Sequence, residues 1–192
     1  MALSGINSVF SVKQVFWSNI LLAICCAFYL AWWLAAFKPT GAVKGIKSGW
    51  LLIPAFAAGL ISIITAVKGI QSAPVSATLF PKRSLLWGGI AAYIILLLIT
   101  QFFFKRKVTT ELILIVGWAA MMMSEIDMLY GIGHISHGTA AAFVAVVAVF
   151  VFISLGCYVI YYRLSGRAGY FDGMVPLLLV ALAAVCVSAV AA

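Results

Sequence analysis

The sequence predicts an all-α integral membrane protein, built as a bundle of about six transmembrane helices with short loops. Hydrophobic residues make up 66% of the chain and charged residues only 8%, whereas soluble domains carry about 25% charge. A spanning helix needs ~20 apolar residues, so 192 residues supply about six spans. Lipid admits only helices or closed barrels, and these apolar runs are too long for strands. We therefore expect a single polytopic membrane domain over residues 1–192.

The expected spans follow from the apolar runs and their breaks. The first, about 15–37, ends at Lys38-Pro39-Thr40-Gly41, because proline cannot continue a helix and glycine suits its exit. The second, about 49–70, contains Pro54, which either kinks the helix or occupies the tolerated first turn, and we favour the first turn. The other spans are about 84–104, 110–131, 139–162 and 174–192.

Three loops have a clear character. Residues 71–83 hold two prolines and no apolar period, which predicts the longest loop. The basic run 105–107 predicts a tight turn that makes the third and fourth spans antiparallel neighbours. Residues 163–173 are glycine-rich and are expected to form the last loop.

Basic residues predict the orientation, because positive loops stay in the cytoplasm. With the N-terminus outside, eight Lys or Arg residues lie in cytoplasmic loops and four on the external side. Both termini are therefore predicted to be external, in a prokaryotic cell membrane. The net charge of +8 comes from residues scattered at span ends, a pattern that indicates topology and contact with membrane lipid and not nucleic-acid binding.

Two carboxylates and both histidines gather in residues 124–138, at the end of the fourth span. A carboxylate inside the bilayer is costly unless it is neutral, paired or hydrated, so Glu125 and Asp127 are functional candidates. If the helix continues, Asp127, Tyr130, His134 and His137 share one face. Glu125 lies about 200° from Asp127 and would point into the bundle.

Four interpretations of this cluster remain open. A divalent metal could take His134, His137 and Asp127, although Gly131 and Gly133 would interrupt the helix between them. A haem could use either histidine as an axial ligand. A proton or cation could pass along Glu125 and Asp127. Alternatively, the turn is a polar cap whose side chains bond backbone groups, and the carboxylates pair with a basic residue such as Lys68.

Few other polar residues interrupt the spans. Ser18, Asn19, Thr65, Tyr93 and Gln101 are expected mainly to hydrogen-bond between helices. If a route crosses the bundle, we expect Asn19, Tyr93 and Glu125 along it. The six tryptophans are interpreted as interfacial anchors, and the four cysteines as small apolar side chains.

The sequence thus favours a transporter, channel or transporter subunit for a small solute or ion, and not an enzyme, since GxSxG, HExxH, P-loop and GxGxxG patterns are absent from it. One alternative is a metal- or haem-binding redox protein centred on His134 and His137. The other is a non-catalytic membrane subunit, or a homo-oligomer, that packs through its small residues.

Overall fold

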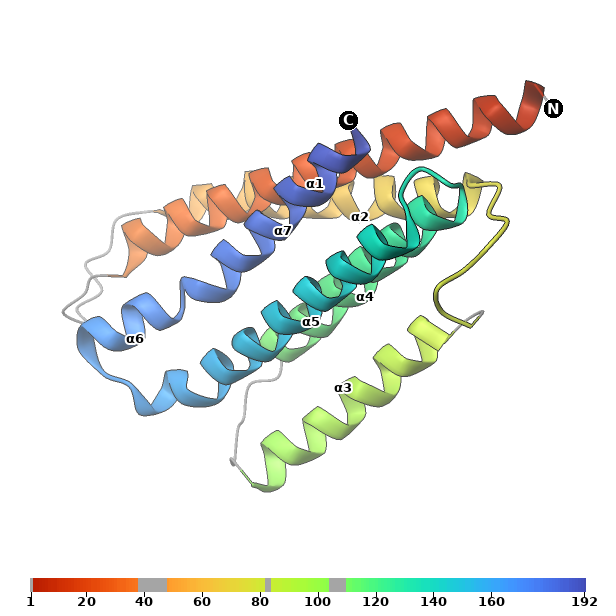
Figure 1. Ribbon diagram of the computed structural model, residues 1–192. Helices are drawn as coiled ribbons and strands as arrows, with labels where there is room; N and C mark the ends of the chain where they lie inside the picture. Colours follow the sequence, from red (N-terminus) through yellow and green to blue (C-terminus); the bar gives the residue numbers. More distant parts are fainter. Residues whose placement is uncertain (1, 38–47, 82–83, 104–109) are drawn as a thin grey trace.

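The computed structural model describes residues 2–37, 48–81, 84–103 and 110–192. Every regular element in these ranges is a helix, and six of the helical segments are long and apolar enough to cross a membrane (Figure 1). Large apolar side chains are exposed along their outer faces, as expected where lipid and not water is the solvent. The chain is an all-α polytopic membrane protein.

Helix α1 (Ala2–Ala36) is much longer than the span predicted at 15–37. Its N-terminal part packs against the end of α2 (Leu52–Ser72), where Gly69 lies against Ser11 and Gln14. The Ser11 and Ser72 hydroxyls are 3.1 Å apart across this contact. The early start of α1 is a correction to the prediction, and packing on α2, a partner distant in sequence, supports the added helix at Ser11 and Gln14.

A short 3₁₀ segment, Ser48–Leu51, leads into α2. Pro54 is the third residue of α2, so it lies in the first turn as favoured, where a missing N–H costs no helical bond. After α2, residues 73–81 run without helix toward the end of α4 (Thr110–Gly131).

Helix α3 (Ser84–Phe102) packs mainly against α4 and lies at the outer edge of the bundle. Helix α4 has the predicted bounds. The predicted basic turn at 105–107 lies outside the described residues, as do the loop lysines of 38–47 and Lys82 and Arg83. The predicted orientation of the termini therefore stays a prediction.

The C-terminal region differs from the prediction. Helix α5 (His137–Ile160) begins two residues early, because the Ser136 hydroxyl caps it by accepting the Thr139 N–H at 3.2 Å. A 3₁₀ turn, Tyr161–Arg163, follows. The predicted glycine-rich loop contains a helix, α6 (Gly166–Asp172), which is separated by a short break from α7 (Val175–Ala191).

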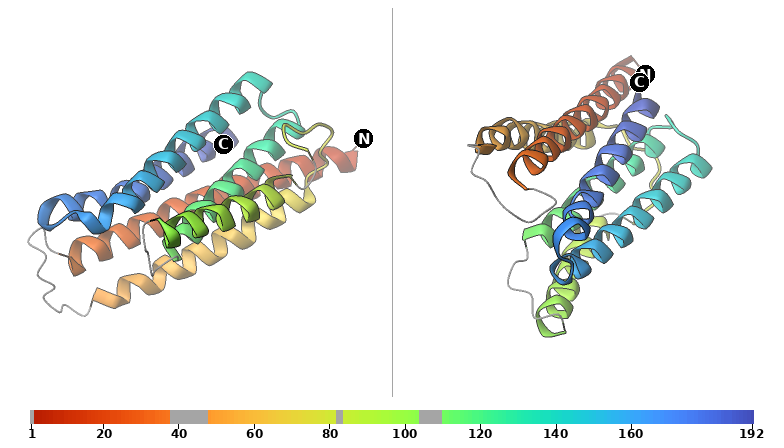
Figure 2. Two further views of the ribbon diagram at one scale, coloured as in Figure 1. Left: turned by 90° about the horizontal axis from the view of Figure 1, so that it is seen from below. Right: turned by 90° about the vertical axis from the view of Figure 1, so that its left-hand side faces the viewer.

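The helices form two antiparallel pairs with α7 between them. Helices α1 and α2 make one pair, α4 and α5 the other, and α7 contacts both α1 and α5 (Figure 2). Helix α4 also reaches α2, which closes the bundle around a common interior. Both termini point toward the same end, which also carries the turn between α4 and α5. The opposite end carries α6 and is called here the α6 end.

Candidate functional site

A carboxyl group lies in the centre of the bundle. Glu125 of α4 and Asn19 of α1 both have no exposed surface. The Asn19 amide donates a 2.7 Å hydrogen bond to Glu125 Oε2 and a second, of 3.0 Å, to the Val15 carbonyl. The two partners are 106 positions apart in the sequence, so this contact is a product of the tertiary fold.

Two buried serines extend the polar group to α2. The Ser62 hydroxyl donates to the Ser18 carbonyl at 2.8 Å, and the two hydroxyls are 3.4 Å apart. Ser18 also faces the Glu125 carboxyl without completing a hydrogen bond to it. Three helices therefore meet at a polar core made of Ser18, Asn19, Ser62 and Glu125.

The polar core is incompletely satisfied. Glu125 Oε1 and Asn19 Oδ1 are both buried and lack a hydrogen-bond partner. Among the described residues no basic side chain pairs with Glu125, so the predicted pairing with Lys68 is not formed. Unsatisfied buried polar atoms cost about 1–3 kcal/mol each, so the polar core lowers the stability of the bundle.

A cavity of about 650 Å³ occupies the α6 end of the bundle. Its walls come from α1, α2, α4, α5 and the segment around the α6–α7 break, and they are mostly apolar. Two of the six tryptophans, Trp33 and Trp118, are among the lining residues. Three cysteines, Cys25, Cys26 and Cys157, also line it.

The polar core lies just beyond the inner end of this cavity. Leu22 lines the cavity three residues after Asn19, and Gly59 lines it three residues before Ser62. Three residues of helix rise about 4.5 Å, so about one helical turn separates the cavity from Asn19 on α1, whereas on α2 the lining residue Ile63 directly follows Ser62. On α4, Trp118 is two turns from Glu125, and the fully buried Met122 lies between them.

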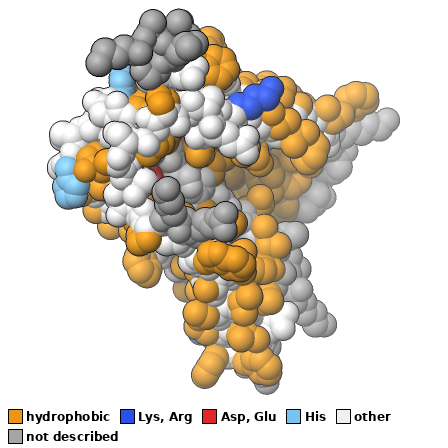
Figure 3. Space-filling model, turned by 90° about the vertical axis from the view of Figure 1, so that its right-hand side faces the viewer, with side chains coloured by type: hydrophobic (Ala, Val, Ile, Leu, Met, Phe, Trp, Pro, Cys, Tyr) orange, Lys and Arg blue, Asp and Glu red, His pale blue; other side chains and the backbone are white. Residues whose placement is uncertain are grey.

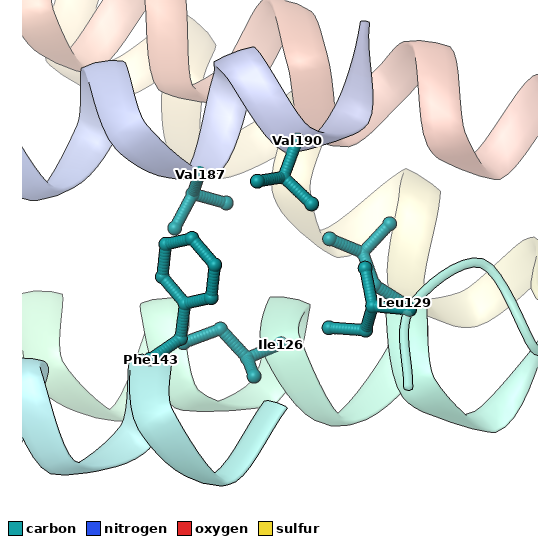
Figure 4. Close-up of a pocket in the computed structure, with 6 residues that line it drawn as sticks. Ile126, Leu129, Phe143, Val187 and Val190 are labelled. Carbon is teal, nitrogen blue, oxygen red and sulfur yellow. The ribbon is translucent and has the colours of Figure 1, made fainter. Parts of the chain in front are cut away.

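The opposite end of the bundle is closed by apolar packing. Side chains of Ile126, Leu129, Phe143, Val187 and Val190 point toward one another from α4, α5 and α7 (Figure 4). The crevice that they enclose has no room for a water molecule. Val12 and Val15 of α1 and Ile70 of α2 belong to the same hydrophobic cluster, so apolar side chains separate the polar core from the end that carries the termini.

Asp127 has a structural contact. Its Oδ1 accepts the Leu79 N–H at 2.5 Å, and Ser76 donates to the Gly131 carbonyl through both N–H and hydroxyl, at 3.0 and 2.9 Å. These bonds hold the 73–81 segment against the end of α4. No contact in the structure supports the prediction that a proton or cation passes along Asp127.

We expect Asp127→Ala to lower the free energy of unfolding by about 1–2 kcal/mol, because it leaves the Leu79 N–H without its acceptor. Asp127→Asn keeps an acceptor oxygen and should stay close to wild type. Thermal unfolding and the rate of tryptic cleavage after Lys82 or Arg83 measure the difference. If Asp127→Ala and Asp127→Asn unfold at the same temperature and are cleaved at the same rate, the hydrogen bond between Asp127 and Leu79 contributes nothing to stability.

The histidines occupy the exposed turn after α4, at the edge of the molecule (Figure 3). The helix ends at Gly131, and Gly133 has a φ of 76°, so the predicted four-residue face does not form. His134 Nε2 lies 3.0 Å from the Val190 carbonyl, and the His137 ring meets Tyr130 edge-on at 5.7 Å. His134 and Ser136 thus bond backbone groups, as in the polar-cap interpretation.

The predicted metal ligands are not brought together. His134, His137 and Asp127 form no group able to hold a metal, and the rest of the described chain has no group of three or more His, Cys, Asp or Glu residues with that ability. The chain reversal at Gly133 separates the histidines from Asp127, whose carboxylate is used by the 73–81 segment. Neither histidine lines the large cavity, which contains no predicted haem ligand.

Other predicted polar residues separate into two groups. Asn19 joins Glu125, and Ser18 joins Ser62, both between helices as expected. Tyr93 lies on α3 beside Leu112, Ile115 and Tyr158, away from Glu125, so the structure does not place it with the polar core. Thr65 bonds the Ile61 carbonyl within its own helix, and Gln101 is exposed.

Sequence reasoning missed three polar residues of the interior. Ser62 belongs to the polar core, while Ser154 and Asp172 line the cavity. Asp172 carried a signal, because it is one of only four acidic residues in the chain and directly precedes an apolar run. The two serines carried none, since serine is common in membrane helices.

Comparisons with known protein families, curated proteins and solved structures found no match to this chain.

Proposed function

We propose that the chain is a transporter, or the membrane subunit of one, that moves a small solute or ion with Glu125 as its charged element. The observation that carries this proposal is the placement of a fully buried carboxyl, only partly hydrogen-bonded, one to two turns beyond the end of a large intramembrane cavity. Ionisable groups inside membrane bundles are costly and typically mark solute or proton pathways.

The chemistry of the polar core fits coupling to a proton or cation. A buried carboxylate without a cationic partner costs several kcal/mol, and binding a proton or cation removes that cost. Asn19 presents its amide to one carboxyl oxygen and leaves the other oxygen unoccupied. The free oxygens of Glu125 and Asn19 are therefore available to a cation or a donor that arrives from the cavity.

Closure at the other end supports transport by alternating access. The apolar crevice of Ile126, Leu129 and Phe143 closes the bundle at the end that carries the termini, while the cavity leads toward the polar core from the α6 end. In the proposed cycle the structure represents the state open toward the α6 end. Opening toward the termini requires α7 to move from α4 and α5, which it meets through small and apolar side chains.

The test is proton flux in proteoliposomes loaded with a pH-sensitive dye, driven by a potassium gradient and valinomycin. Wild-type protein should carry flux above that of protein-free vesicles, and Glu125→Gln should reduce it to that background. The amide of glutamine can accept from Asn19 Nδ2 and donate to the unpaired Asn19 Oδ1, so the bundle should stay folded.

The matched control is Asp127→Asn, the same change of carboxylate to amide two residues away on α4. It should leave flux unchanged, because the Asp127 carboxylate contacts the 73–81 segment and not the polar core. Equal flux from wild type and Glu125→Gln, with both proteins folded, would refute the proposed role of Glu125.

A further inference from the structure

The walls of the large cavity have a specific chemical character. Aromatic rings come from five of the segments that line it: Tyr29, Trp33, Phe56, Trp118, Tyr158 and Tyr161. The remaining lining residues are chiefly aliphatic side chains and cysteines. Faces of Trp and Tyr rings attract cations that have lost part of their hydration.

Polar groups of the wall are few, and two of them lack partners. Among the described residues, Asp172 is the only charged one that lines the cavity, and its Oδ2 atom is buried without a hydrogen-bond partner. Ser154 is fully buried in the same wall, and its hydroxyl also lacks a partner. Cys157 lies beside Asp172. An acceptor-rich spot therefore interrupts an otherwise apolar aromatic surface.

The position of Asp172 is held by the aromatic wall itself. Trp33 donates its indole N–H to the Tyr170 carbonyl at 3.2 Å and packs against Gly173, so that α1 fixes the α6–α7 break. A Cβ atom at position 173 would collide with the Trp33 ring, which explains why glycine follows Asp172. These contacts fix the position of Asp172 relative to the Trp33 ring.

We propose that this cavity binds a lipophilic organic cation, with its charged centre near Asp172 and its apolar body among the aromatic rings. An anion would meet a carboxylate with no described basic residue in the cavity wall, and a neutral apolar molecule or lipid chain would leave Asp172 and Ser154 unpaired. A hard metal ion such as Ca²⁺ would find a single carboxylate in the described wall, with phenol and thiol groups in place of the several carboxylate and carbonyl oxygens that it prefers.

The cavity also leads such a ligand toward the polar core. Its inner end lies about one helical turn from Asn19 on α1 and reaches Ile63 beside Ser62 on α2, so a ligand that moves inward from Asp172 approaches the polar core that contains Glu125. As a statement about the transported substrate, this inference rests on the proposed function. As a statement about binding, it depends only on the cavity and on Asp172.

The binding test uses tetraphenylphosphonium and tetraphenylborate, two ions of matched size and shape with opposite charge. Calorimetric titration into protein in nanodiscs of phosphatidylcholine, corrected with empty nanodiscs, measures both. We expect the cation to bind and the anion not to bind. Asp172→Asn should weaken the cation about tenfold, which corresponds to about 1.4 kcal/mol. Asp127→Asn, with its carboxylate outside the cavity, should bind as wild type does.

A second measurement does not depend on the Asp172 variant folding. Cys157 lines the cavity, whereas Cys186 is exposed on α7 outside it. Tetraphenylphosphonium should slow alkylation of Cys157 by N-ethylmaleimide in the wild-type protein and leave Cys186 unchanged, as read by mass spectrometry. Slowing at both cysteines, or at neither, counts against binding in the cavity.

Equal binding of the two ions, or a lipid chain that fills the cavity and is not displaced by the cation, would overturn the inference. The outcome is separable from that of the proposed function. Glu125-dependent proton flux without cation binding would refute the ligand class alone. Cation binding that requires Asp172, with flux insensitive to Glu125→Gln, would refute transport through Glu125 and leave the binding site in place.

Discussion

Replacing Asn19 with leucine is expected to lower the free energy of unfolding by about 3 kcal/mol, because it leaves the Glu125 carboxyl buried with no hydrogen-bond donor. Leucine has the same branching and the same number of side-chain heavy atoms as asparagine, so the effect does not come from an empty space. Unfolding by titration with sodium dodecyl sulfate, followed by circular dichroism and tryptophan fluorescence, measures the change.

The double variant Asn19→Leu/Glu125→Met gives the decisive comparison. Replacing both members of a buried polar pair with apolar side chains is often neutral or stabilising, so this protein should return to within about 1 kcal/mol of wild type. It should also carry no flux. If the double variant is as unstable as the sum of its single variants, the two side chains are not energetically coupled and the polar core is not a unit.

Alanine at Gly69 and at Gly117 should change stability in opposite directions. A Cβ atom at Gly69 would lie 2.9 Å from Gln14 Cβ and 3.3 Å from the Ser11 carbonyl oxygen, so α1 and α2 must separate. Overpacking of this kind costs about 1–3 kcal/mol. Gly117 lies within α4 with nothing within 4 Å of its would-be Cβ, and alanine there should stabilise by about 0.5 kcal/mol through helix propensity.

The same detergent titration compares these two proteins with wild type. Gly69→Ala should also release the N-terminal part of α1, which rests on Gly69 and Ser72, and hydrogen exchange there should rise more than in α4. Unchanged stability and exchange in Gly69→Ala would mean that the close contact between α1 and α2 tolerates separation.

Stability and function make different demands on the polar core. Packing would be served better by apolar side chains at positions 19 and 125, yet the chain places an amide and a carboxyl there and leaves one oxygen of each unpaired. Polar residues that weaken a membrane bundle are expected at functional sites. A double variant that is as stable as wild type but carries no proton flux would show this conflict directly.

The candidate site was only partly accessible to sequence reasoning. Glu125 stood out because carboxylates are rare in the chain and costly in lipid, and its helical angle separated it from Asp127. The partner Asn19 was named for a route, but its bond to Glu125 is a contact across 106 residues that no local pattern encodes. Tyr93 was named on the same grounds and lies elsewhere, because polarity alone does not report which face of a helix meets the interior.

The sequence by itself determined the class of protein, the number of spans and most of their limits, because apolar runs of spanning length can be satisfied only as helices in lipid. Tertiary structure decided what local pattern could not. It packed the early part of α1 on α2 at Ser11 and Gln14, formed α6 within the expected loop with Gly173 against Trp33, and used Asp127 to hold the 73–81 segment. It also created the cavity and joined Glu125 to Asn19. The physical reason is that helix formation depends on neighbouring residues, whereas a binding site depends on which helix faces meet.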